Sequence, residues 1–292
     1  MRSRLVLATA LAPVLALGLA ACGADDASSD AEATADDAAS APTDAAACEA
    51  ADLPTLTDGT LTVGASEPFE PWYVGDPSSG EGFEAALVYE VADRLGYAAE
   101  DVEWTSVTFE QIVSPAIKTF DVAAYQTTIT DERAEAVDFS SPYLTSRQGV
   151  IVADDGEFAD AASLADLAGA TVGVTASQTS LDAAEQAWGD DVEVVPFSAA
   201  GDGMTALTSG TVDAMVMDVD QGVAASTVYF PDATVIGTLP DAGEPEQLGL
   251  VLDKDSELTD CVSAAVDELE ADGTLDELRT TWLSSDDIEQ LS

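Results

Sequence analysis

From residue 60 to residue 283, short apolar runs with the length of β-strands alternate with amphipathic stretches. Residues 83–95 (FEAALVYEVADRL) illustrate the amphipathic stretches, because their apolar residues fall on one face of a helix. Alternation of strands and helices is typical of parallel α/β sheets with helices packed on their faces. The alternation extends over two runs of about 100 residues each, which predicts two α/β lobes.

The individual elements follow from the same pattern. Strands are expected at 60–65, 102–107, 120–125, 148–153, 171–175, 192–196, 212–218 and 249–252. Further helices are expected at 179–188, 203–209, 257–271 and 275–283. One more helix is predicted to open at Thr130, whose hydroxyl can cap the first turn and is followed by Asp131 and Glu132, which the helix dipole favours.

Residues 1–21 have the pattern of a bacterial lipoprotein signal peptide. A short basic start precedes an apolar run at 5–19, and LAAC follows at 19–22. The alternative is a transmembrane anchor, but a run of about 15 residues that Pro13 interrupts is too short to span a bilayer. We therefore expect lipid on Cys22 and an extracytoplasmic protein anchored to the outer face of the cell membrane.

Residues 22–49 are predicted to form a disordered, acidic, Ala-rich tether. Between 23 and 47 the chain has no aromatic residue and no Val, Leu, Ile or Met. A segment with nothing to bury and mutually repelling acids cannot offset its ordering entropy.

The charge and the missing residue types exclude several function classes. The chain has 57 acidic and 8 basic residues and no histidine. Nucleic acids and anionic membrane surfaces both require basic patches, so neither is expected as a partner. Without histidine, neither a Ser-His-Asp nor a Cys-His catalytic arrangement can form, and no phosphate-binding Gly-rich loop is present. The sequence predicts a protein that is not an enzyme and carries no cofactor or metal.

Three cysteines are present, and Cys22 is assigned to lipid. The remaining two, Cys48 and Cys261, would lie in an oxidising compartment, which favours a disulfide between them. Two free thiols are the alternative.

Six segments, taken in order, resemble the family 3 extracellular solute-binding proteins, which are receptors of ABC importers for polar amino acids. The segments are GTLTVG (59–64), GFEAALVYEVADRLG (82–96), TITDERAEAVDFSSPY (128–143), SLADLAGATVGV (163–174), SGTVDAMVMD (209–218) and ELEADGTLDELRTTWL (268–283). The resemblance covers residues 53–283 with matching spacing.

This resemblance implies an α/β, two-lobed type II periplasmic-binding-protein fold, in which each lobe is a mostly parallel sheet flanked by helices. Lobe 1 would comprise 50–146 and 249–292, and lobe 2 would comprise 149–246. A two-strand hinge near 146–150 and 246–250 would let the lobes close on a ligand, a motion for which periplasmic binding proteins are a standard example. We expect a monomer that passes an amino acid to an ABC permease.

The resemblance also assigns roles to individual residues. Arg133 would bind the ligand's α-carboxylate, for which a guanidinium offers two parallel hydrogen bonds. Asp218 would pair with the α-ammonium group. The alternatives are a surface arginine paired with a neighbouring acid and an acid that caps a strand end. Further candidates for hydrogen bonding are Thr128, from the motif match, and Gln126, one step away on the same strand face. Ser177, Gln178 and Thr179 open a helix that could hold the same carboxylate, with plain N-caps as the alternative. Phe69, Trp72 and Phe109 match aromatic walls, with a place in the core as the alternative.

Two departures from the family bear on selectivity. Many relatives carry an aspartate at the position of Ser66, whereas the acids here are Glu67 and Glu70, and Gln126 replaces the usual glycine. An acidic pocket edge favours a neutral polar or cationic amino acid, because an anionic side chain needs a second buried cation. Arg147, near the expected hinge, is a candidate for that cation and leaves the selectivity open.

Two other functions remain as alternatives. A cyclohexadienyl-dehydratase-like enzyme has this fold, and a substrate assay on ligand-stripped protein discriminates it from a receptor. A ligand-sensing module is usually fused to a signalling helix, which the sequence does not predict after residue 19.

Overall fold

The computed structural model describes residues 48–240, 245–285 and 287–292. The predicted signal peptide, the lipidation site Cys22 and the tether up to residue 47 lie outside the described residues. Across the described part of the chain, no helix combines the length and the apolar character that crossing a membrane would require.

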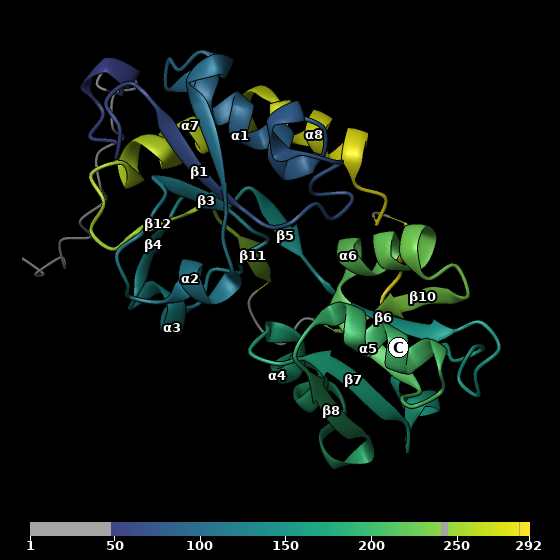
Figure 1. Ribbon diagram of the computed structural model, residues 1–292. Helices are drawn as coiled ribbons and strands as arrows, with labels where there is room; N and C mark the ends of the chain where they lie inside the picture. Colours follow the sequence, from purple (N-terminus) through teal and green to yellow (C-terminus); the bar gives the residue numbers. More distant parts are fainter. Residues whose placement is uncertain (1–47, 241–244, 286) are drawn as a thin grey trace, which may run out of the picture. The chain divides into compact units, whose positions relative to one another are not determined.

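Lobe 1 is built on a five-stranded sheet in the order β2-β1-β3-β12-β4 (Figure 1). Its strands are β1 (Leu61–Ala65), β2 (Val102–Ser106), β3 (Val122–Ala124), β4 (Val137–Phe139) and β12 (Val251–Asp253). The strand β1 is parallel to β2 and β3, whereas β12 is antiparallel to both of its neighbours. The sheet is therefore mostly parallel with one reversed strand, as predicted.

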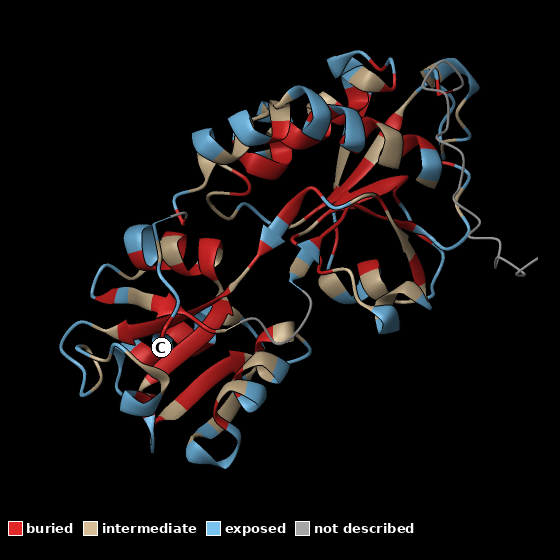
Figure 2. Cartoon of the chain, turned by 180° about the vertical axis from the view of Figure 1, so that it is seen from behind, coloured by how far each residue is buried: buried red, intermediate tan, exposed pale blue. Residues whose placement is uncertain are grey.

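Helices cover both faces of this sheet. They are α1 (Phe83–Arg94), α2 (Phe109–Val113), α3 (Asp131–Ala134), α7 (Thr259–Asp272) and α8 (Thr274–Trp282). The apolar face of α1, including Phe83, Leu87 and Val91, packs with α7, α8 and the strands in one core cluster. Ile112 of α2 belongs to a smaller cluster with residues of β3, β4 and β12. Figure 2 shows the buried residues concentrated in the strands and on the helix faces that meet them.

Lobe 2 repeats this architecture with the order β10-β6-β9-β7-β8. Its elements are β6 (Gln148–Ala153), β7 (Thr171–Thr175), α4 (Thr179–Trp188), β8 (Glu193–Phe197), α5 (Ala200–Thr208), β9 (Ala214–Asp218), α6 (Val219–Ala224), a π-helix (Ala225–Tyr229) and β10 (Ala233–Thr238). The strand β6 is antiparallel to β9 and β10, and the other pairs are parallel. Buried Val150 and Val172 share a core cluster with residues of α4, whereas Ile151 and Met215 share one with residues of α5.

Two short strands link the sheets. The strand β5 (Leu144–Ser146) pairs antiparallel with β11 (Glu246–Leu248), and Ser146 lies opposite Glu246. The chain passes from β5 into β6 through Arg147, and after β11 it returns to lobe 1 as β12. These segments coincide with the residues predicted as the hinge, and hinge motion itself stays a prediction.

The C-terminal segment corrects one predicted boundary. We expected 249–292 to belong wholly to lobe 1, and α7 and α8 do pack there. The residues after α8 instead reach lobe 2, where Leu291 is 3% exposed within the core and Gln290 pairs with Thr238. Leu291 provides the apolar side chain that makes this segment part of lobe 2, and an isolated leucine after a helix gives no such signal in the sequence.

Several elements were not predicted. The strands β4, β5 and β11 have three residues each, which is too short for a period to be recognised. The helix α6 begins directly where β9 ends, and its glycine, Gly222, weakens the helical pattern. The strand β10 was also missed.

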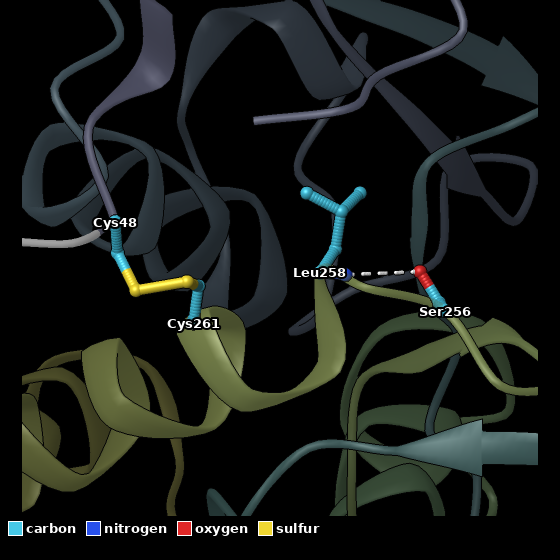
Figure 3. The surroundings of a disulfide bond; sticks show 4 residues. All are labelled: Cys48, Ser256, Leu258 and Cys261. Atoms are coloured by element: carbon cyan, nitrogen blue, oxygen red, sulfur yellow. Dashed lines mark hydrogen bonds between the residues drawn. A yellow bond between two sulfur atoms is a disulfide. The ribbon is translucent and has the colours of Figure 1, made fainter. Parts of the chain in front are cut away.

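The predicted disulfide joins Cys48 to Cys261, the third residue of α7 (Figure 3). Both cysteines are buried in the lobe 1 core, and their Cα atoms lie 5.5 Å apart. The bond closes a sequence separation of 213 residues. In the loop-entropy account, a loop of this length stabilises the folded state by about 5 kcal/mol.

We expect a Cys48→Ser/Cys261→Ser variant to melt at a lower temperature, because its unfolded state regains the loop entropy. Differential scanning calorimetry measures the change, and a reducing agent should lower the melting temperature of the wild type but not of the variant. Because both cysteines lie within lobe 1, ligand affinity should stay near that of the wild type. Free thiols at both positions by mass mapping would contradict the assignment.

Leu291→Ala should destabilise the protein by about 2 to 5 kcal/mol, the usual cost of truncating a buried leucine. Urea unfolding provides the measurement. The control is Leu56→Ala, because Leu56 is 59% exposed and its truncation should change stability by less than about 0.5 kcal/mol. Equal effects of the two substitutions would show that the C-terminal segment does not pack on lobe 2 in solution.

Candidate ligand-binding site

A cavity of about 850 Å³ is lined by residues of both lobes. Lobe 1 contributes the loop after β1, the start of α2 and the residues that follow β3. Lobe 2 contributes the ends of β7 and β9 with α4, α5 and the π-helix. Eight of the predicted site residues line it: Ser66, Glu67, Phe69, Phe109, Gln126, Gln178, Thr179 and Asp218. Its size lies within the range of small-molecule sites.

Gln126 is held in an unusual conformation on the lobe 1 wall. Its φ is +46°, in the left-handed region that a residue with a side chain seldom adopts. The buried carboxylate of Glu84, at the start of α1, accepts hydrogen bonds from the Gln126 backbone N–H at 2.7 Å and from its side-chain amide. Tyr143 also donates to Glu84. Glycine, which the resemblance implies at this position, adopts a positive φ without strain, and the bonds to Glu84 offset the strain of a glutamine.

Aromatic side chains form two walls. Phe69, from the loop after β1, stacks on Tyr229 of the π-helix with ring centroids 5.8 Å apart and an interplanar angle of 9°. This contact joins the two lobes at the cavity. The guanidinium carbon of Arg133 lies over the ring of Phe109, at the start of α2, and is 5.0 Å from the ring centroid. This distance is typical of a cation–π contact.

Trp72 was predicted to line the cleft, and this prediction is wrong. Its side chain is fully buried in the lobe 1 core, with its ring edge-on to Phe83 at 5.6 Å. Burying the large apolar area of a tryptophan in the core stabilises the fold more than leaving it at the wall of an open cavity.

Asp218 ends β9 at the boundary of the cavity. Its Oδ1 accepts hydrogen bonds from the Gln148 amide at 2.8 Å and from the Ser146 hydroxyl at 3.2 Å. Burial, followed by the nearby negative charge of Glu246, raises the pKa of Asp218 to about 7. A carboxylate so destabilised gains from a cationic partner, as expected of a group that binds ammonium.

Arg133 and Thr128 lie beside the cavity rather than among its lining residues. Arg133 is half-buried, and its Nη1 donates to the Thr128 carbonyl at 2.8 Å. Burial lowers the pKa of the guanidinium, while the negative charges of Glu246 and Asp218 raise it. The side chain is thus held by the ring of Phe109 and the carbonyl of Thr128.

Of the predicted lobe 2 motif, residues 177–179, only two residues line the cavity. Thr179 and Gln178 line the cavity at the start of α4, and the hydroxyl of the following residue, Ser180, is buried with no hydrogen-bond partner in the described part of the chain. Ser177 instead has a φ of +63° and is exposed outside the lining. The turn that places Thr179 at the cavity therefore leaves Ser177 outside it.

The charges of the lining are acidic. Glu67, which accepts a hydrogen bond from Ser106 at 2.8 Å, and Asp218 are its charged members among the described residues. Arg147, the candidate second cation, does not line the cavity: its guanidinium donates to the carbonyls of Ile288 and Ser285 in the C-terminal segment. Glu70 also lies outside the lining. The suggestion that Arg147 neutralises an anionic ligand is therefore wrong.

Several lining residues were not predicted: Pro68, Ser106, Val107, Thr108, Gln111, Tyr125, Gln148, Thr175, Ser180, Ala200, Gly201, Met204, Met217, Gln221, Ala225, Tyr229 and Phe230. The side-chain amide of Gln148 donates to Asp218 and to Glu246. Its position within the expected hinge could have indicated a place at the site. Tyr229 gave no signal, because the helix that carries it was not predicted.

The chain matches the family described as bacterial extracellular solute-binding proteins, family 3, over residues 61–285. It is 29% identical to the L-cystine-binding protein TcyJ of Escherichia coli (strain K12) over 236 residues, which cover 78% of this chain and 84% of that protein. It is 27% identical to the arginine-binding extracellular protein ArtP of Bacillus subtilis (strain 168) over 234 residues, covering 77% and 87% of the two chains.

Solved structures agree with these matches. An ancestral arginine-binding protein bound to arginine has a TM-score of 0.62 and 32% identity, with 77% of this chain and 99% of that chain covered. The ancestral amino acid-binding protein AncCDT-1, described as a precursor of cyclohexadienyl dehydratase, has a TM-score of 0.62 and 29% identity, with 77% and 96% covered. The two mostly parallel sheets, the two linking strands and the matched residues lead to one conclusion: the chain belongs to the bacterial extracellular solute-binding proteins of family 3.

Proposed function

We propose that the protein captures a neutral or cationic amino acid in the cavity and delivers it to an ABC permease. The observation that carries this proposal is the pairing of two different subsites at one cavity. Asp218 offers a carboxylate to an ammonium group, while Thr128, Thr179 and Arg133 offer donors to a carboxylate. An α-amino acid has both groups on one carbon.

In this proposal Arg133 and the two threonine hydroxyls hold the ligand's carboxylate, and Asp218 holds its ammonium group. Phe69, Phe109 and Tyr229 would pack against the carbon skeleton. Ser66 Oγ, Ser180 Oγ and Gln148 Oε1 are buried at the cavity without a hydrogen-bond partner among the described residues, and they supply further polar contacts. Polar atoms buried at a cavity gain free energy when a ligand satisfies them.

The acidic lining supports selection against glutamate and aspartate. With Glu67 and Asp218 as its charged members and Arg147 bonded elsewhere, the described lining gives an anionic side chain no second cation. A buried uncompensated charge costs several kcal/mol. Relatives are named for L-cystine, arginine and glutamate, so the preference rests on the lining and not on the relatives.

Delivery to a permease and anchoring by lipid on Cys22 complete the proposal. The first follows from family membership, and the second rests on the LAAC motif. A monomer needs no second copy to complete the cavity, because both walls come from one chain.

The enzyme alternative is a cyclohexadienyl-dehydratase-like activity. The alternative is supported by the similarity of this chain to AncCDT-1, a precursor of cyclohexadienyl dehydratase. AncCDT-1 is itself described as an amino acid-binding protein. Mass spectrometry of ligand recovered after incubation tests it, and we expect the ligand to be unchanged.

A thermal-shift screen of the twenty amino acids with ornithine, citrulline and cystine tests the function. A ligand at 100 times its Kd should stabilise the protein by about 2.7 kcal/mol. We expect a shift with neutral polar or cationic members and none with glutamate or aspartate. If no member of the set raises the melting temperature of ligand-stripped protein, the proposed function is wrong.

Arg133→Ala should weaken binding of the best amino acid by about 2 to 5 kcal/mol, as for removal of one partner of a desolvated charge pair. Arg133→Lys keeps the charge but loses the paired donors, so it should restore part of the affinity. Calorimetry provides the measurement. The control is Arg94→Ala, which removes a cation bonded to Asp272 on the surface of lobe 1 and should leave Kd unchanged. Unchanged affinity in Arg133→Ala would exclude this subsite.

Binding should weaken as the pH falls through the pKa of Asp218, about 7. An ammonium ligand requires the ionised carboxylate, so affinity at one pH unit below this value should be about tenfold lower than at high pH.

Because the folded-state pKa of Asp218 is raised, this group stabilises the ligand-free fold below about pH 4, and that stability is lost as the pH rises through the folded-state pKa. Asp218→Asn should bind weakly at every pH, and calorimetry from about pH 5.5 to 8.5 distinguishes the two profiles.

A further inference from the structure

Glu246 lies where donors from both lobes converge. It is the first residue of β11, and its Oε2 accepts a hydrogen bond from the Thr179 hydroxyl at 2.8 Å and makes a longer contact at 3.4 Å with the Thr128 hydroxyl. The amide nitrogen of Gln148 lies 3.3 and 3.2 Å from its two oxygens. Thr128 belongs to lobe 1, whereas Thr179 and Gln148 belong to lobe 2.

The guanidinium of Arg133 lies near this set, where its Nη1 donates to the backbone carbonyl of Thr128 at 2.8 Å. Glu246 is the foremost of the negative charges that favour the protonated guanidinium against its burial. Two hydroxyls, an amide N–H and a nearby guanidinium are the donors that a carboxylate binds in proteins. The structure therefore contains a carboxylate-binding site, and the carboxylate in it is a side chain of the protein.

The donors that Glu246 contacts include those proposed to bind the ligand's carboxylate. Thr179 lines the cavity directly, and Thr128 and Arg133 are the residues to which the proposed function assigns the ligand's carboxylate. Two carboxylates cannot share one set of donors without strong repulsion. A ligand that uses these donors must first move Glu246 away.

We propose that Glu246 is an internal carboxylate that competes with the ligand's carboxylate for the hydroxyls of Thr128 and Thr179. The proposal rests on the proposed function for the class of ligand, but the competition itself extends to any small carboxylate. Affinity is then reduced by the fraction of molecules in which Glu246 occupies the donors. Because Glu246 lies in β11, its release acts on the strand that pairs with β5 and links the lobes.

The ammonium subsite is coupled to this exchange. The Gln148 amide donates to Asp218 as well as to Glu246, and the charge of Glu246 raises the pKa of Asp218 after the effect of burial. Asp220 and Tyr143 also interact electrostatically with Asp218, and Ser146 donates a hydrogen bond to it. The ligand's carboxylate would replace the negative charge of Glu246, while its ammonium group would favour ionised Asp218.

Acetate tests the competition without knowledge of the natural ligand. In Glu246→Ala the donors lose their internal partner, so sodium acetate should bind at least about fivefold more tightly than to the wild type. Thermal shifts in acetate, compared with sodium chloride at the same ionic strength, give the two affinities. The matched control is Glu193→Ala, which removes an exposed glutamate of β8 and should behave as the wild type. Equal acetate affinity in all three proteins would overturn the proposal.

The best amino acid of the screen gives a second, independent result. Glu246→Ala should lower its Kd by about 3- to 30-fold, because the competing side chain is gone. Glu246→Gln keeps the shape of the side chain and the fold, and it should give a smaller decrease. Unchanged or higher Kd in both variants would show that Glu246 does not compete. If the wild type binds no amino acid, the proposed function fails while the acetate comparison still decides this proposal.

Discussion

The antiparallel pairing of β5 with β11 is the constraint on which the site depends. It places Ser146 opposite Glu246, and the next pair along the chain, between β6 and β9, places Gln148 opposite Asp218. These four polar residues meet because two short ladders follow one another across a single connecting residue, Arg147. The backbone hydrogen bonds of the ladders thus fix the spacing of two carboxylates that would otherwise repel each other.

The scarcity of cations makes the position of each one informative. Most of the basic residues in the described part of the chain are committed away from the cavity. Arg94, Lys254 and Arg279 form ion pairs with acids, Lys118 donates to three backbone carbonyls, and Arg147 binds two carbonyls of the C-terminal segment. Arg133 alone among these described cations lies beside the cavity, on the ring of Phe109. The positive charge of the site therefore comes from one side chain, the guanidinium of Arg133.

Both ends of a zwitterionic ligand would meet protein groups that already interact. Gln148 donates to the carboxylate proposed for the ammonium end and to the carboxylate that competes at the other end. Coupling through one amide gives a physical reason why the ligand's two charged groups would act together rather than as separate anchors. It also explains why Asp218 tolerates a half-buried position next to another acid.

The sequence by itself determined the alternation of strands and helices and the motif around Arg133, because periodicity and motif spacing are local. It also favoured the pairing of Cys48 with Cys261, the two cysteines that remain once Cys22 is assigned to lipid. It located α4 and β7 to the residue, since both have full-length apolar patterns. Only the tertiary structure decided that Trp72 belongs to the core, that Arg147 and Leu291 bind the C-terminal segment to lobe 2, and that Glu246 meets Thr128 and Thr179. Each of these outcomes depends on contacts between residues far apart in the chain. The pattern of a single segment does not predict the free energy of such contacts.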